Sequence, residues 1–178
     1  MIAIRVVVWM AIVLVHGSVI VLIPYLLVCA NIQLFSGDLG IFRWLGFLPI
    51  MLGGLIVLWS VWDLTFTGKG TPAPFDPPKE FVVRRLYCFV RNPMYLGDLL
   101  VLVGESLLFE SAILLIYAVL MLCVFHLFVV LHEEPTLKRK FGEPYERYRE
   151  AVPRWIPAWR PYQQPLVCHD RVAPKDFK

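Results

Sequence analysis

The stretch "YCFVRNPMYLGDLLVLVGESLLF", residues 87–109, decides how this chain folds and where its polar chemistry lies. Its first third holds the polar sequence "RNPMY", and the rest is an apolar run with the character of a membrane helix. Asn-Pro favours a turn, and proline is pre-organised for the first position of a helix. We therefore expect a helix from Pro93 to about Phe109 that begins beside Arg91, Asn92 and Tyr95.

The composition indicates that most of the chain lies in lipid. Of its 178 residues, 58% are hydrophobic and 17% are charged, and the mean hydropathy is +0.66. Soluble domains are nearer to half apolar and about a quarter charged. A soluble core could not bury this much apolar surface, so the bilayer is the expected solvent.

Four apolar runs are candidates for membrane helices, which need about 20 residues each. They cover about residues 4–30, 41–62, 93–109 and 113–131, and the third is the shortest and holds Asp98 and Glu105. Because lipid leaves no backbone unsatisfied, we predict an all-α, polytopic membrane bundle of about four transmembrane helices with a cytoplasmic C-terminal amphipathic helix. The alternative for the first run, a cleaved signal, requires a shorter apolar stretch.

The chain divides into three parts, and the basic residues orient them. We expect a first transmembrane hairpin over 1–62, a core over 63–158 and a loose tail over 159–178. Positive charge concentrates between the second and third runs and after Leu131, whereas the turn around Glu110 has none. This distribution places both termini and the middle loop in the cytoplasm, most simply of a bacterial inner membrane. The net charge of +3 then reflects topology and contact with membrane lipid, and no nucleic-acid partner is expected.

Two polar stretches flank the second pair of runs. The proline-rich segment "GKGTPAPFDPPKEFV", residues 68–82, is either a stiff connector or the wall of a pocket. In the other, Glu133 and Glu134 follow a membrane helix directly, although helix C-termini prefer cations. A bound cation or a hydroxyl-rich ligand would explain this acidic pair. The apolar stripe after it (Leu137, Phe141, Tyr145 and Tyr148) reads as an interfacial helix or a pocket wall, broken near Gly142 and Pro144.

Single polar residues inside the runs allow less specific readings. His16 and His126 are expected to be hydrogen-bond partners between helices rather than catalysts. Asp98 and Glu105 lie on one helix face, and acids inside a membrane are functional candidates, although Glu105 could mark the far interface. Arg91 alone is explained by a side chain that snorkels to the headgroups. No metal site is expected, because the cysteines form no CxxC pair and "HEEPT" is not HExxH.

Taken together, the segments "GKGTPAPFDPPKEFV", "RNPMYLG", "EEPTLKRKFGEPYERY" and "VPRWIP" resemble the isoprenylcysteine carboxyl methyltransferase family, in its bacterial branch related to the phospholipid methyltransferases. The resemblance covers residues 64–158. It implies a helical membrane methyltransferase that uses S-adenosyl-L-methionine on the cytoplasmic side. Glu133 is the first choice for the cofactor's ribose hydroxyls or ammonium group, and Glu134 is the second. The full set of cofactor-binding residues that the resemblance implies is Lys79, Glu80, Phe81, Val82, Tyr87, Arg91, Asn92, Pro93, Tyr95, Glu133, Glu134, Tyr145, Tyr148 and Arg154.

The chain departs from the prenylcysteine enzymes at one position. In those enzymes an arginine about one turn before the acidic pair handles the substrate carboxylate, whereas residues 127–131 here are "LFVVL". The expected methyl acceptor is a lipophilic small molecule, either an isoprenylcysteine carboxylate or another lipid-soluble carboxylate, amine, thiol or phenol. No catalytic side chain is assigned, since in-line methyl transfer needs mainly alignment and a dry site.

Two other functions remain as alternatives. One is an NADPH-dependent membrane reductase of the sterol-reductase type, against which the acidic pair argues, because NADPH requires basic residues for its extra phosphate. The other is a non-enzymatic membrane partner protein, which has no need of both the "RNPMY" motif and the acidic pair.

Overall fold

The computed structural model describes residue 14 and residues 16–30, 39–67 and 83–163, and this part of the chain contains helices and no strands. Every predicted apolar run coincides with a helix over its described residues. The elements in chain order are the π turn η1 (Ser18–Leu22), α2 (Ile23–Cys29), the 3₁₀ segment η2 (Gly40–Gly46), α3 (Phe47–Thr67), η3 (Arg85–Cys88), α4 (Pro93–Leu108), α5 (Ala112–Phe128), the π turn η4 (Val129–Glu133), α6 (Glu134–Phe141) and α7 (Glu143–Ala151).

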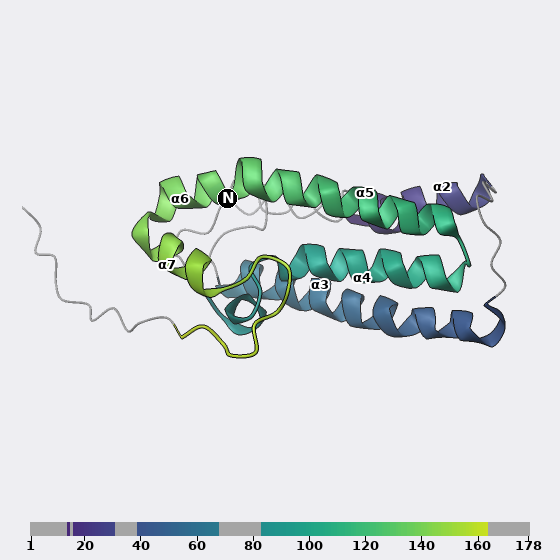
Figure 1. The fold of residues 1–178 in the computed structure, drawn as a ribbon, viewed down its shortest axis with the longest axis horizontal. Helices are drawn as coiled ribbons and strands as arrows, with labels where there is room; N and C mark the ends of the chain where they lie inside the picture. The colour runs from purple at the N-terminus through teal and green to yellow at the C-terminus, as the bar shows by residue number, and fades with distance from the viewer. Residues whose placement is uncertain (1–13, 15, 31–38, 68–82, 164–178) are drawn as a thin grey trace, which may run out of the picture.

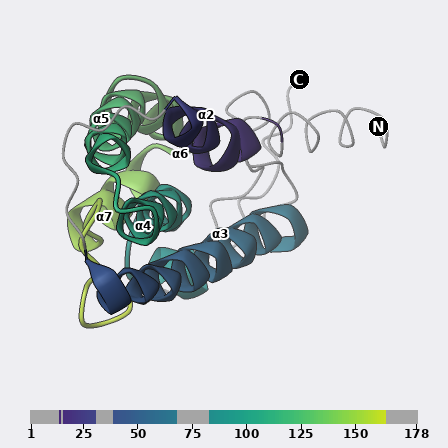
Figure 2. The ribbon, with the colours of Figure 1, turned by 90° about the vertical axis from the view of Figure 1, so that its right-hand side faces the viewer.

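Helix α4 lies at the centre of the bundle. In Figure 1 it runs antiparallel to α3, with α5 along its other side, and the end-on view in Figure 2 shows α3 and α5 on different sides of it. Leu102 of α4 and Leu114 of α5 are completely buried. The shortest and most acidic of the predicted runs is thus an interior helix, which explains how it tolerates Asp98, itself fully buried.

Glycines bring α3 and α4 into close contact. A Cβ atom added at Gly53 would lie 2.4 Å from the carbonyl oxygen of Gly97, and one added at Gly46 would lie 2.4 Å from that of Gly104. Small residues at a helix interface let the two backbones approach closely, which is a common way to associate helices in membranes. The two pairs are seven residues apart on each helix, so they hold α3 against α4 along much of its length.

The N-terminal helix is attached to this bundle by polar contacts. The Tyr117 hydroxyl of α5 donates a hydrogen bond to the carbonyl oxygen of Val19 (3.1 Å). His16 Nδ1 lies 3.0 Å from Asp98 Oδ2 of α4. His16 therefore contacts another helix, although the contact with Asp98 lacks the geometry of the hydrogen bond that was expected.

Two of the described helices are long and apolar enough to cross a membrane: Gly40–Asp63, which joins η2 to α3, and Ala112–Phe141. Their outward side chains are large and apolar, as at Leu48, Leu58, Ile116 and Leu120, all of which are exposed. Such surfaces suit lipid contact. Helix α4 has 16 residues and α2 is shorter, so the four-span topology stays a prediction.

The chain turns sharply between α6 and α7, where Gly142 has a φ of +60°. This confirms the predicted break near Gly142 and Pro144. Tyr145 and Tyr148 of α7 are buried with Val83 and Val152 in a small core beside the start of α4. The aromatic stripe therefore packs on the protein itself, while contact of these helices with the membrane surface stays a prediction.

Candidate functional site

The C-terminal segment lies alongside the residues that lead into α4, at the left end of the bundle in Figure 1. Three backbone hydrogen bonds hold it there: Arg91 N–H to Pro153 O (3.0 Å), Ala158 N–H to Phe89 O (2.8 Å) and Tyr162 N–H to Cys88 O (2.9 Å). The "VPRWIP" segment thus packs directly on the approach to "RNPMY". The third bond lies within the predicted tail, so ordered contacts continue to residue 162.

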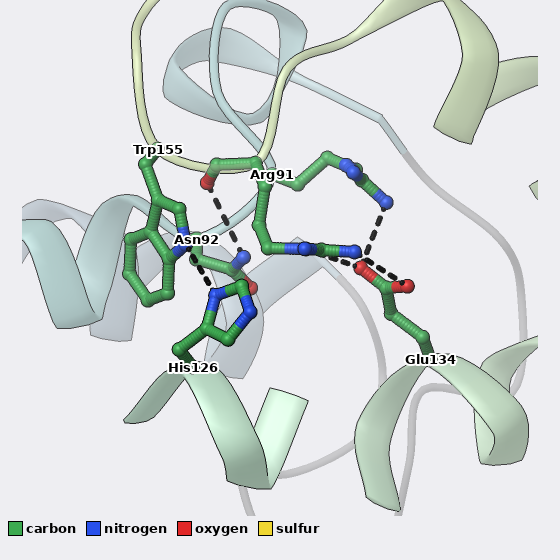
Figure 3. A network of polar contacts seen from close by, with 6 residues as sticks. Arg91, Asn92, His126, Glu134 and Trp155 are labelled. Carbon is green, nitrogen blue, oxygen red and sulfur yellow. Dashed lines mark hydrogen bonds and ion pairs between the residues drawn. The ribbon is translucent and has the colours of Figure 1, made fainter. Parts of the chain in front are cut away.

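Side chains strengthen this attachment (Figure 3). The amide nitrogen of Asn92, which precedes the first turn of α4, donates to the carbonyl oxygen of Arg154 (3.3 Å). The indole N–H of Trp155 donates to His126 Nδ1 of α5 (3.2 Å). His126 is a hydrogen-bond partner, as expected, although its partner comes from the C-terminal segment rather than from a helix. The segment is therefore fastened to both α4 and α5.

Glu134 is held by two arginines (Figure 3). Its Oε1 lies 2.9 Å from Arg91 and 2.8 Å from Nε of Arg154, and its Oε2 accepts a third bond from Arg154 (3.1 Å). The side chains of Glu134 and Arg91 are only 10% and 11% exposed. Arg91 therefore does not snorkel to the headgroups, because a buried carboxylate inside the protein holds it. Removing one partner of such a buried charge pair strongly destabilises the folded protein, because the other charge stays buried without compensation.

Glu133 has a different environment from its neighbour. The Tyr95 hydroxyl donates to Glu133 Oε1 (2.5 Å), and the Tyr95 ring stacks on Phe125 of α5 with 4.8 Å between centroids. Within the described part of the chain, no hydrogen bond to Glu133 Oε2 is present. One carboxylate oxygen of Glu133 is thus available for a ligand.

The local helix geometry explains why the two acids differ. Successive residues of a helix point about 100° apart, so one helix face cannot present both side chains to the same partner. The π turn η4 (Val129–Glu133) places Glu133 over Tyr95, and Glu134, which opens α6, over the two arginines. Single π turns inside α-helices are frequent at functional sites.

Tyr87, Tyr145 and Tyr148, three of the predicted site residues, pack beside the start of α4. The Tyr148 hydroxyl donates to the carbonyl oxygen of Tyr87 (2.8 Å). Burial raises the pKa of Tyr148 well above its usual value, and burial together with the nearby Tyr148, Glu133 and Asp63 raises that of Tyr87. Both phenols therefore stay protonated at physiological pH. Tyr145 is likewise buried, and it lies beside Arg91 and Glu134.

Sequence reasoning missed a polar cluster at the end of α3. The Asp63 carboxylate is 7% exposed and its Oδ1 lies 2.7 Å from Arg85, while its Oδ2 and the Ser60 hydroxyl are buried without a hydrogen bond in the described part of the chain. Arg85, which forms this ion pair, has a φ of +51°, a conformation that is uncommon for non-glycine residues. The sequence did contain a signal for this cluster: Asp63 comes directly after the apolar run 41–62, and the basic pair Arg84 and Arg85 follows later.

The structure gathers most of the predicted site residues at one end of the bundle. Lys79, Glu80, Phe81 and Val82 lie outside the described residues. Among the residues that are described, no group of three or more His, Cys, Asp or Glu side chains could hold a metal ion. The predicted residues that meet around the start of α4 are Tyr87, Arg91, Asn92, Pro93, Tyr95, Glu133, Glu134, Tyr145, Tyr148 and Arg154.

Comparison with known proteins identifies the family. The family model for phospholipid methyltransferases matches residues 41–144, which include α3, α4, α5 and the acidic pair. An uncharacterized protein of Haemophilus influenzae is 33% identical over 63 residues, which are 35% of this chain and the whole of that protein. No solved structure matches. The resemblance seen in the motifs is thus confirmed, and the chain belongs to the phospholipid methyltransferase family.

Proposed function

We propose that this protein is an integral membrane methyltransferase that uses S-adenosyl-L-methionine and methylates a lipophilic acceptor at the cytoplasmic face. Three findings support the proposal. The chain belongs to a methyltransferase family, two of its helices are long and apolar enough to span a bilayer, and most of the predicted cofactor-binding residues that the structure describes meet around the start of α4.

The observation that carries the proposal is the difference in hydrogen bonding between the adjacent Glu133 and Glu134. Glu134 accepts three hydrogen bonds from Arg91 and Arg154, which engage both of its oxygens, so it braces the site. Of the described residues, only Tyr95 binds Glu133, and none of them donates to its Oε2. A partly buried carboxylate with one free oxygen fits a ligand that brings hydroxyl or ammonium donors, as S-adenosylmethionine does.

The residues of this chain would then bind and orient the cofactor. S-adenosylmethionine, when bound, supplies an electrophilic methyl group on a positively charged sulfur. Glu133 holds hydroxyl or ammonium groups of the cofactor, and Tyr95 fixes the carboxylate for that role. The paired Arg91, Arg154 and Glu134 keep the C-terminal segment closed over this end and exclude water. Alignment and a dry site supply most of what in-line methyl transfer needs.

The acceptor would reach this site from the bilayer. Leu127 and Leu131 of the "LFVVL" stretch are exposed and apolar, so this side of α5 and η4 suits lipid and provides no arginine for a carboxylate. We propose an inner-membrane location with both termini cytoplasmic, on the basis of the distribution of basic residues. Reporter fusions to the two termini and to the turn at Glu110 test this orientation, and a cytoplasmic Glu110 would refute it.

Calorimetric titration of the detergent-purified protein with S-adenosylhomocysteine tests the function, with NADPH as a parallel titrant. We expect saturable binding of S-adenosylhomocysteine alone. Asn92→Ala and Glu133→Gln should weaken it at least tenfold, while Glu150→Gln, an exposed acid of α7, should leave it unchanged. NADPH binding alone would support a reductase instead, and binding of neither ligand by folded protein would support a non-enzymatic role. Normal affinity in both site variants would refute the site assignment.

A further inference from the structure

A second buried polar pair lies deeper in the bundle than the acidic pair. Asp98 of α4 is completely buried, and its Oδ2 lies 3.0 Å from Nδ1 of His16 on the N-terminal helix. Neither oxygen of Asp98 accepts a well-aligned hydrogen bond from a described residue. Among the described residues, His16 is the one basic side chain within ion-pair distance of Asp98. Nothing in the site assigned above uses either residue.

The pair lies next to the proposed cofactor site. Asp98 follows Tyr95 by three residues, so the two side chains lie on one face of α4 about one turn apart. Tyr95 in turn donates to Glu133. The pair is therefore one turn further into the membrane from the residues that would hold the cofactor, on the side of α4 that faces the N-terminal helix.

Charge balance limits which protonation states this place allows. A lone carboxylate in an apolar interior is costly, and a neutral pair of carboxylate and imidazolium is favoured over a pair with net charge. A positively charged sulfur arriving nearby would add one unit of charge. Release of the His16 proton would leave the pair with one negative charge and restore neutrality. The structure thus contains a group able to exchange one proton for one ligand charge.

We propose, resting on the function proposed above, that Asp98 and His16 form a proton-exchange site that compensates the charge of S-adenosylmethionine and then receives the proton of the methyl acceptor. His16 is deprotonated while the charged sulfur is present. During transfer, the acceptor atom forms the bond to the methyl carbon, and the electron pair of the broken carbon–sulfur bond stays on sulfur. The acceptor's proton passes to the His16 imidazole, so each state of the site is neutral.

This role implies an acceptor that brings a proton, which is a lipophilic amine, thiol or phenol rather than a carboxylate. Other titratable groups lie on the elements packed around α4. Tyr95 and Glu105 are on α4 itself, Tyr117 is on α5, Glu133 is on η4 and Asp63 is on α3. Of these, Glu105 is the matched control, because it is a second partly buried acid on the same helix, seven residues away and also without a bond to one oxygen.

The test measures proton release on binding and needs no acceptor. S-adenosylmethionine and S-adenosylhomocysteine are titrated calorimetrically in two buffers of different ionisation enthalpy, at several pH values around neutrality. The two ligands differ by the charged sulfonium, and any titration of their own groups is common to all variants. We expect wild type to release about one proton more with S-adenosylmethionine than with S-adenosylhomocysteine.

The variants decide the assignment. Asp98→Asn, nearly identical in shape, and His16→Gln should each abolish the difference in proton release, while Glu105→Gln should retain it. If a single variant fails to fold, the double variant Asp98→Asn/His16→Gln replaces it in the test, because both of its new side chains are uncharged. An equal proton release for both ligands in wild type, or a difference that survives in Asp98→Asn, would overturn this inference alone. Binding of neither ligand by wild type would overturn the proposed function as well.

Discussion

Replacing Gly53 by alanine tests the packing that positions the whole site. The new Cβ would lie 2.4 Å from Gly97 O and 3.0 Å from both Leu100 Cβ and Val101 Cγ2. An ordinary carbon–oxygen contact is about 3.3 Å, so α3 and α4 must separate by about 0.9 Å. The nearest atom is backbone, so no side-chain rotation relieves the contact.

Two opposing effects set the size of the change. Overpacking of this kind costs about 1–3 kcal/mol. Alanine is favoured over glycine in a helix by about 1 kcal/mol, which offsets part of that cost. The neighbouring Gly54 separates the two effects, because a Cβ there meets nothing within 4 Å. Gly54→Ala should therefore stabilise the protein by up to about 1 kcal/mol.

The comparison of the two variants is the decisive measurement. Since the helix-propensity gain is common to both, the difference in their free energies of unfolding isolates the overpacking term, about 1–3 kcal/mol. Thermal unfolding of the detergent-purified variants, followed by helical circular dichroism, should show Gly53→Ala melting below Gly54→Ala. Equal melting temperatures, or the reverse order, would refute the close contact between α3 and α4.

Further variants test the supports of the site. Glu134→Gln should lower the free energy of unfolding by about 3–5 kcal/mol, because it leaves two arginines without their buried carboxylate, and an unchanged thermal melt would contradict that brace. Tyr148→Phe should cost about 1 kcal/mol in the same assay, since the carbonyl of Tyr87 loses its donor. Lys138 lowers the pKa of Glu146 below its ordinary value, so this pair stabilises at neutral pH and the contribution is lost as the pH falls through the lowered pKa. Lys138→Gln should therefore melt below wild type at pH 7 and approach it below about pH 4, and a constant gap across this range would argue against the pairing.

The helices could be predicted from the sequence because each apolar run is long and bounded by clear signals. Asn92-Pro93 marks the start of α4, and Gly142 marks the break between α6 and α7. Which helix lies inside the bundle could not be predicted, since that depends on contacts between helices. By composition, α3 is as suitable for burial as α4. The side of η2 and α3 that contacts α4 is the one that carries Gly46 and Gly53.

The sequence indicated which polar residues meet around the start of α4, but it did not indicate which of them pair with one another. Glu133 and Glu134 are adjacent and chemically identical, but Glu133 ends the π turn and is bound by Tyr95, whereas Glu134 opens α6 and is held by two arginines. The proximity of Asp98 to His16, which are 82 positions apart in sequence, depends on how the N-terminal helix packs. Contacts of this kind follow from tertiary structure and leave no local pattern in the chain.

The pairings give "RNPMY" a second role beside the contact with the cofactor that the resemblance implies. Arg91 holds Glu134, and Asn92 holds the backbone of Arg154. Tyr95 connects the motif to Glu133, whose second carboxylate oxygen accepts no hydrogen bond from the described residues. The motif therefore also fastens the C-terminal segment over the end of the bundle, and we expect its loss to expose the site to water as well as to weaken cofactor binding.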